Sequence, residues 1–189
     1  YQSTYAKEPL AIGSYLPLER VYSYNPIPPV LTKQQSSYIL GAQGNVWTEH
    51  MSDENKVFYM AYPRALALAE VNWTQEKNKS YSDFIKRLHQ HSKWFKENNI
   101  SFSLSYLDLN YKTKNNNNHV ELIINKPALD GSILLETIKD GDAKQEYTTA
   151  DTFILDKTLN CKAWYQLKDK TLSRPITIDF VSHLGAGKN

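Results

Sequence analysis

The sequence is poor in cysteine: Cys161 is the only one among 189 residues. A single thiol cannot form a disulfide within the chain, so the fold cannot depend on an internal cross-link. The cysteine count neither requires nor excludes an oxidising compartment, and we expect Cys161 to be a small buried residue.

Long apolar runs are also absent, and none approaches the roughly 20 residues that a membrane-spanning helix needs. The first residues, "YQSTYAKEPL", contain no Met and no basic-then-apolar signal pattern, so we expect the chain to be cut from a longer protein. A missing signal sequence then carries no information about where that protein resides.

A strong charge of one sign is lacking too, because 22 Lys and Arg stand against 20 Asp and Glu, for a formal charge of +2. No cluster of basic residues lies on a helix or glycine loop of the kind that binds phosphate, so nucleic acid is not an expected partner. With 41% hydrophobic and 22% charged residues, the composition is that of a globular protein with one large or two small cores.

Helical periodicity dominates the first half of the chain. A short helical turn is expected near Leu18 to Tyr22, within a Tyr- and Pro-rich loop that reaches Pro29. From Ser52 or Asp53 as a cap, apolar residues recur at helical spacing as far as Trp73, and Pro63 should kink that helix. A second helix is expected in "YSDFIKRLHQHSKWFKENN", capped by a serine and stopped at its Asn-Asn end.

Strand-like segments follow the polar run "KTKNNNN", which we interpret as an exposed loop or interdomain edge. These segments are "HVELIIN", "SILLETIK", "DTFILD", "CKAWYQLK" and "PITIDFV". Short spacing and intervening Pro, Gly and Asp residues are typical of a small antiparallel β-sandwich. In "CKAWYQLK", Trp164 and Tyr165 fall on opposite faces, so one is expected in the core and the other is a minor candidate for stacking on carbohydrate.

The segment from Tyr38 to Glu49 reads as a strand that leads into a site loop. In an extended strand, alternate side chains fall on opposite faces. One face carries apolar residues suited to packing under a helix: Tyr38, Leu40, Ala42 and Val46. The other face carries polar and aromatic residues: Gln43, Asn45, Trp47 and Glu49. Polar side chains at a strand's carboxyl end, with helices outside, are typical of a (β/α)8 barrel and its active site.

Trp47 and Glu49 together suit a sugar ring. The apolar C–H face of a pyranose packs on an indole, and its hydroxyl groups need acceptors such as a carboxylate. The same residues also allow a structural interpretation, in which Trp47 belongs to the core and Glu49 caps the next helix.

The stretch "ILGAQGNVWTEHMSDENKVFYMAYPRALALAEVNW" resembles the C-terminal barrel segment of the β-N-acetylhexosaminidases of glycoside hydrolase family 20. That family's pattern runs Gly-x-Gln, then Trp-Thr-Glu, then Pro-Arg-x-x-Ala-x-Ala-Glu and a Trp. The matching residues are Gly41, Gln43, Trp47, Thr48, Glu49, Pro63, Arg64, Ala67, Ala69, Glu70 and Trp73. The resemblance extends from Tyr1 to about Phe102, with a departure at Ile12, where some members carry a tryptophan that lines the cleft.

The resemblance implies a substrate-assisted retaining mechanism, in which the 2-acetamido oxygen attacks the anomeric carbon while a glutamic acid protonates the leaving oxygen. Trp47 would form the floor under the terminal sugar, and Glu49 would accept hydrogen bonds from its 4- and 6-hydroxyls. The family's Asp-Glu pair has no counterpart here, so no catalytic residue, metal or cofactor is expected in this chain, which alone should be inactive.

The expected fold is therefore α/β plus all-β: the C-terminal segment of a (β/α)8 barrel over residues 1–104, then a small antiparallel β-sandwich with a C-terminal linker over residues 105–189. Expected partners are glycans ending in N-acetylhexosamine and the remainder of the barrel, in a protein that the resemblance makes secreted, periplasmic or cell-surface. The alternative is a non-catalytic carbohydrate-binding or interaction module built on the β-sandwich.

Overall fold

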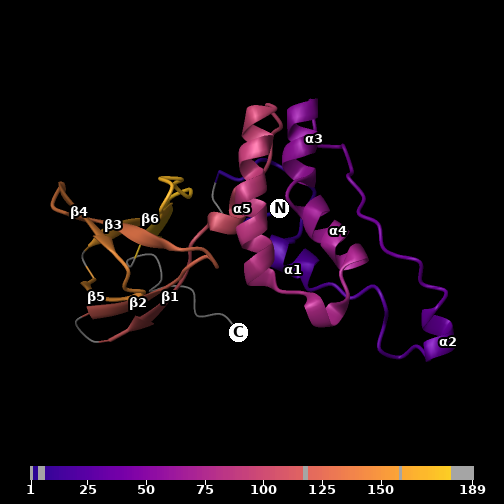
Figure 1. The fold of residues 1–189 in the computed structure, drawn as a ribbon. Coiled ribbons are helices and arrows are strands. Elements are labelled where there is room, and N and C mark those ends of the chain that lie inside the picture. The colour runs from indigo at the N-terminus through magenta and orange to yellow at the C-terminus, as the bar shows by residue number, and fades with distance from the viewer. Residues whose placement is uncertain (1, 4–6, 117–118, 158, 180–189) are drawn as a thin grey trace. The chain divides into compact units, whose positions relative to one another are not determined.

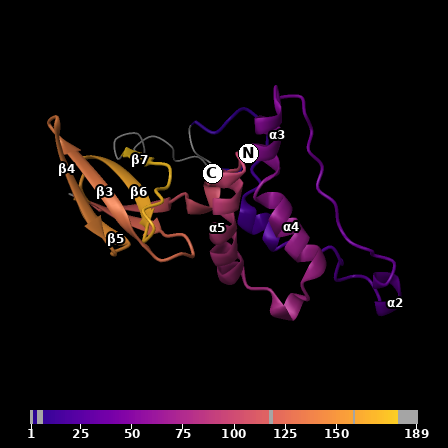
Figure 2. The same cartoon turned by 45° about the horizontal axis from the view of Figure 1, so that its top comes forward.

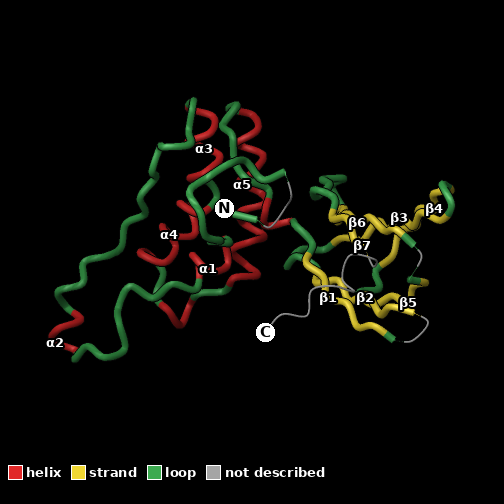
Figure 3. The backbone as a smooth tube through the Cα atoms, turned by 180° about the vertical axis from the view of Figure 1, so that it is seen from behind, coloured by secondary structure: helices red, strands yellow, loops and turns green. Residues whose placement is uncertain are grey.

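The computed structural model describes residues 2–3, 7–116, 119–157 and 159–179 of the chain. The chain divides into two compact units, residues 1–106 and 107–189. The first is built of helices and loops and the second of strands, as the colouring by secondary structure in Figure 3 shows. None of the described helices is both long and apolar enough to cross a membrane.

The N-terminal unit contains five α-helices and two short 3₁₀ turns among its described residues. They are α1 (Leu18–Tyr22), α2 (Lys33–Ser36), α3 (Glu54–Ala61), α4 (Arg64–Trp73), η1 (Glu76–Asn78), α5 (Tyr81–Glu97) and η2 (Ser105–Leu107), which ends at the start of the second unit. Figure 1 shows α1, α3, α4 and α5 gathered together, whereas α2 lies at the far end of a long excursion of the chain.

The signals that begin and end these helices lie where the sequence predicts them. Asp53 caps α3, and its carboxylate accepts the backbone N–H of Lys56, which lowers the pKa of Asp53. Pro63 lacks the N–H that a continuing helix needs, and it separates α3 from α4 after a cis peptide bond. Ser80 caps α5, and Asn99 follows its end in the left-handed conformation, with a φ of 56°.

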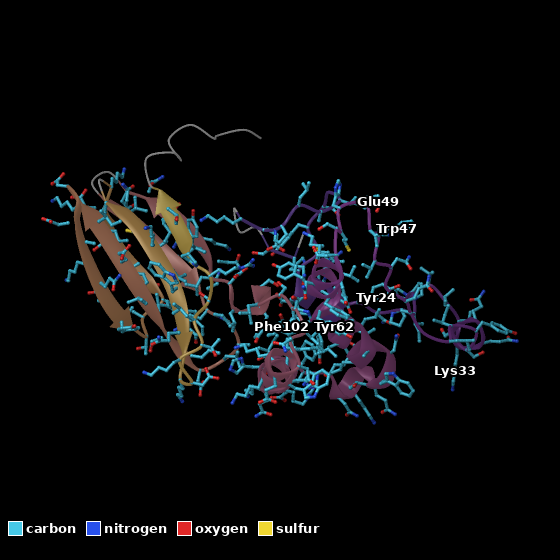
Figure 4. The ribbon with its side chains drawn as sticks, turned by 90° about the horizontal axis from the view of Figure 1, so that it is seen from above. Tyr24, Lys33, Trp47, Glu49, Tyr62 and Phe102 are labelled. Carbon is cyan, nitrogen blue, oxygen red and sulfur yellow. The ribbon has the colours of Figure 1, made fainter. Side chains whose placement is uncertain are left out.

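The core of the N-terminal unit forms around one face of α5. Its buried face consists of Phe84, Ile85, Leu88, Ser92 and Phe95. The ring of Phe95 lies 4.9 Å from that of Tyr62 and 5.1 Å from that of Phe102, between centroids, and Figure 4 labels these two outer rings. Aromatic rings therefore join α5 to the end of α3 and to the chain that follows α5.

The predicted strand over Tyr38 to Glu49 is not present. Tyr38 lies in a turn after α2, and residues 39–48 have no regular secondary structure. The face predicted to pack under a helix is open, with Leu40 97% exposed. The physical reason is that a strand needs neighbouring strands for its hydrogen bonds, and none of the described residues in 1–106 forms one.

The C-terminal unit consists of two antiparallel sheets. Its strands are β1 (Asn110–Asn115), β2 (His119–Asn125), β3 (Gly131–Lys139), β4 (Asp142–Thr148), β5 (Thr152–Asp156), β6 (Asn160–Leu167) and β7 (Ile176–Asp179). One sheet has the order β1-β2-β5 and the other β4-β3-β6-β7, and Figure 2 shows the larger sheet with these four strands side by side. The prediction of an antiparallel β-region is confirmed.

Each sheet buries one face, as period-2 patterns require. On β2 the buried residues are Val120, Leu122 and Ile124, and on β6 they are Cys161, Ala163, Tyr165 and Leu167. Cys161 is buried as expected, and burial raises the pKa of its thiol to about 11. Tyr165 is the core member of the Trp164–Tyr165 pair, and its hydroxyl donates to the carbonyl of Leu129 at 2.5 Å.

Two edge strands depart from the sequence prediction. The polar run after Tyr111 was expected to be a loop, yet Lys112 to Asn115 form most of β1, which pairs with β2. The strand β4 was not predicted, and it pairs with β3 from Ile133↔Thr148 to Lys139↔Asp142. Both strands are polar because an edge strand contributes few side chains to the core, so they lack the alternation that marks a strand in sequence.

A buried ion pair ties the start of the C-terminal unit to the chain before β7. The guanidinium of Arg174 donates to both carboxylate oxygens of Asp108, and its Nε lies 3.0 Å from Oδ1. Both side chains are mostly buried, which strengthens a two-point contact of this kind relative to one in water.

Candidate functional site

A groove of about 740 Å³ runs along the N-terminal unit. One wall is the loop that precedes α1, a second is the irregular segment before α3, and helices α3 and α4 form the floor. The lining residues of the floor are Met60, Ala61, Arg64, Ala65, Leu68, Ala69, Asn72 and Trp73. The floor is thus mostly apolar, with small alanine side chains that leave it open.

The irregular segment is fixed to α4 at two points. The side-chain amide of Asn72 accepts the backbone N–H of Ala42 at 3.0 Å and donates to its carbonyl at 2.9 Å, as a neighbouring strand would. Two residues later, a Cβ at Gly44 would lie 3.2 Å from Leu68, so glycine allows the backbone to approach the helix. The sequence did not indicate this role of Asn72, because an asparagine near the end of a helix marks the helix end and says nothing about contacts with a distant segment.

Trp47 lines this groove, and its side chain is 64% exposed. Glu49 follows at a turn in which the N–H of Met51 donates to the carbonyl of Thr48 at 2.9 Å. Glu49 is also exposed, but it is not among the groove's lining residues. Figure 4 labels both residues, which lie on the segment that precedes α3 in the chain.

The opposite wall is anchored by a polar cluster around Glu8. Its carboxylate accepts the hydroxyl of Tyr59 at 3.0 Å, and Lys56 donates to the carbonyl of Leu10 at 2.9 Å. Both partners belong to α3, so the loop before α1 is held beside the helix that carries the groove's floor. Ile12, the departure from the family pattern, lies on this wall.

Arg64 and Glu70, two residues of the family pattern that lie on α4, have separate partners. Arg64 donates to the carbonyl of Met60, and burial lowers the pKa of its guanidinium while the charge of Glu8 opposes that change. Glu70 accepts from Arg87 and from the hydroxyl of Tyr22, so it joins α1, α4 and α5. Burial and then the contact with Glu70 raise the pKa of Tyr22.

The lining of the groove contains no carboxylic acid. None of the described residues that line it is Asp or Glu, and the titratable side chains that do line it include His50 and Tyr24. Within the described ranges, no group of three or more metal-ligating side chains is found. An indole, small apolar side chains and the amides of Gln43 and Asn45 suit a ring with one apolar face and polar edges.

Comparison with known proteins finds a family match for this part of the chain. Residues 1–76 match the family described as "Glycosyl hydrolase family 20, catalytic domain". This part of the chain is therefore similar to the catalytic domain of glycosyl hydrolase family 20. The match contains both walls of the groove, its floor as far as Trp73, and both Trp47 and Glu49.

Three relatives carry names that agree with this family. A "Beta-hexosaminidase" of Porphyromonas gingivalis is 48% identical over 88 residues, which cover 47% of this chain and 11% of the relative. One of Akkermansia muciniphila is 36% identical over 59 residues, covering 31% of this chain and 12% of the relative. A "Beta-N-acetylhexosaminidase" of Cellulomonas fimi is 37% identical over 54 residues, covering 29% and 11%. The matched part thus spans only about a tenth of these relatives.

Proposed function

We propose that this chain is the C-terminal part of an exo-acting β-N-acetylhexosaminidase, which removes terminal N-acetylglucosamine or N-acetylgalactosamine from glycans. The observation that carries the proposal is Trp47, an exposed indole that lines an apolar groove within the family-matched segment. An exposed tryptophan over small apolar side chains is a surface on which a pyranose ring can stack.

In the intact enzyme, Trp47 is the floor of the subsite for the terminal sugar and Glu49 accepts hydrogen bonds from the 4- and 6-hydroxyls. The exposure of both side chains and their place on one segment support these roles. The reaction is substrate-assisted: the 2-acetamido oxygen attacks the anomeric carbon, and a carboxylic acid elsewhere in the protein protonates the leaving oxygen. Asn72 has a positioning role, since it holds the segment that carries Trp47.

The remainder of the barrel is the second partner of the N-terminal unit. Leu40 and Trp73, at 97% and 89% exposure, are apolar side chains of a kind that a folded enzyme covers. In this arrangement, residues 39–48 become a barrel strand once neighbouring strands satisfy their backbone, within a barrel segment of residues 1–104. Residues 105–189 are then a small β-sandwich domain with a C-terminal linker, and the two antiparallel sheets described as far as Asp179 support this.

The experiment is turnover of a chromogenic N-acetylglucosaminide, measured for the purified 189-residue chain and for the full-length protein. We expect hydrolysis by the full-length protein and none by the chain, because no carboxylic acid lines the chain's groove to protonate the leaving oxygen. Hydrolysis by the pure chain, or none by the full-length protein on either N-acetylglucosaminide or N-acetylgalactosaminide, would contradict the proposal.

A further inference from the structure

The outer face of the four-stranded sheet carries an aromatic row that is separate from the groove. Strand register places Leu134 opposite Tyr147 on β4 and opposite Trp164 on β6, so the three side chains share one face. The residues on either side of Leu134, Ile133 and Leu135, are buried and point into the core, so the row faces away from it. Tyr147 is 62% exposed, and the other two members are half-buried.

The spacing of this row suits more than one sugar ring. Neighbouring strands lie about 4.7–4.9 Å apart, so Tyr147 and Trp164, two strands apart, have backbones roughly 10 Å apart. A row of this length, with Leu134 between two aromatic rings, is an apolar platform for adjoining rings of an extended glycan. A planar ring offers a pyranose an apolar surface, and hydroxyls at the sugar's edge need polar groups beside it.

Polar groups lie next to the row, in a recess of about 350 Å³. Its lining residues are Gly131, Ser132, Tyr147, Gln166, Leu167, Lys168 and Lys170. The volume is at the lower end of the range of about 300–1,000 Å³ for small-molecule sites, which fits one monosaccharide. Tyr147 belongs to both the row and the recess, so a chain of sugars can occupy the two together.

The charge of the recess indicates which sugar it takes. Two lysines line it, and none of its described lining residues is a carboxylate. Lys168 lies 3.1 Å from Asp130, but both side chains are at least 80% exposed, and such surface pairs are weak enough for a ligand to replace. The recess is thus complementary to an anionic group.

We propose that Tyr147, Leu134 and Trp164, with the adjacent recess at Lys168 and Lys170, bind an acidic glycan, in which a sugar bearing a carboxylate or sulfate occupies the recess and its neighbour stacks on the row. The site lies wholly in the C-terminal unit. It contributes no chemistry, and it tethers the enzyme to a polyanionic glycan while the catalytic unit acts elsewhere.

The test is isothermal titration calorimetry of the 189-residue chain with a hyaluronan octasaccharide, whose glucuronate units carry carboxylates, against neutral chitohexaose. We expect hyaluronan to bind, with an affinity that falls as salt rises, and chitohexaose to bind at least about tenfold more weakly. Both the Tyr147→Ala and the Lys168→Ala/Lys170→Ala variants should bind hyaluronan about tenfold more weakly, the loss typical of a truncated anchor.

Two matched controls separate this site from general effects. Lys112→Ala/Lys114→Ala removes the same charge from β1 in the other sheet, and Ile154→Ala removes an exposed apolar side chain from β5. Both should bind as the unsubstituted chain does. No binding of hyaluronan, equal binding of chitohexaose, or an equal loss in the controls would overturn the proposal.

A Trp47→Ala variant keeps this test independent of the proposed glycosidase function, because its substitution lies in the other unit. Hyaluronan binding should be unchanged in this variant. Loss of binding with Trp47→Ala, and not with Tyr147→Ala, would place the glycan in the groove and overturn the C-terminal site while leaving the glycosidase proposal intact.

Discussion

The two units differ in how completely they cover their own apolar side chains. In the C-terminal unit, alternate residues of β2, β3 and β6 are buried, and each strand finds its hydrogen-bond partners within the unit. In the N-terminal unit, Leu40 and Trp73 are almost fully exposed, and Trp73 lines the mostly apolar groove. The two-sheet unit closes its core by itself, whereas the N-terminal unit leaves large apolar side chains uncovered.

Backbone hydrogen bonding explains why the helices of the N-terminal unit form even though part of its apolar surface is uncovered. A helix satisfies its N–H and C=O groups within itself, so α3, α4 and α5 can assemble around Phe95. A strand depends on its neighbours, so residues 39–48 rely on a side-chain amide, that of Asn72, for part of the same bonding.

The largest expected change in stability, and the strongest test of this comparison, comes from a substitution in the core of the C-terminal unit. Leu135→Ala removes a side chain that is 1% exposed at the centre of β3, and it should lower the free energy of unfolding of the C-terminal unit by about 2–5 kcal/mol. Hydrogen exchange measured peptide by peptide should show faster exchange in residues 107–179 and unchanged exchange in α5. Equal acceleration in both units would mean that they do not fold separately.

Alkaline pH provides a second, smaller difference between the units. Burial raises the pKa of Cys161 from 9.0 to about 11, so below pH 9 its thiol is protonated in both states and its contribution to stability is complete. As pH rises from 9 to about 11, the unfolded chain ionises first and that contribution is lost. In the N-terminal unit, burial raises the pKa values of Tyr22 and Tyr81 from 10.0, so their contribution to its stability begins to be lost at a higher pH.

Urea denaturation at pH 8, 9, 10 and 11 can measure that difference. The C-terminal unit should lose stability between pH 9 and 10, and Cys161→Ala should remove that part of the slope, whatever it does to stability at pH 8. A slope that Cys161→Ala leaves unchanged would exclude the thiol as its cause.

The smallest expected effect concerns the open side of the N-terminal unit. Leu40→Ser should change the unfolding free energy of the isolated chain by less than about 0.5 kcal/mol, because a 97% exposed side chain loses no burial. In the full-length protein, the same substitution should destabilise measurably, since Leu40 is then covered. Equal tolerance in both would show that nothing covers this side.

Local signals made much of this architecture predictable. The caps Asp53 and Ser80, the break at Pro63 and the apolar alternation of β2 and β6 all act within a few residues of chain. The family assignment also rests on local sequence, because the pattern around Trp47 is long and ordered.

The remainder depended on contacts that sequence alone does not contain. The strand predicted over Tyr38 to Glu49 failed because pairing partners decide whether an apolar segment is extended. The edge strands β1 and β4 were missed because they are polar, and the hydrogen bonds between the side-chain amide of Asn72 and the backbone of Ala42 join residues thirty positions apart. The recess at Lys168 and Lys170 likewise emerges only when β3, β4 and β6 are side by side.

The central claim is that the segment carrying Trp47 and Glu49 binds the terminal sugar. Its most direct test is kcat/KM of the full-length protein with Glu49→Gln, alongside Glu54→Gln, which changes an exposed carboxylate in the first turn of α3. Glu49→Gln should lose about 1.5–3 kcal/mol of transition-state binding, the scale of a hydrogen bond to a charged group, and Glu54→Gln should lose almost none. An unchanged kcat/KM for Glu49→Gln would remove Glu49 from the sugar subsite and contradict the account.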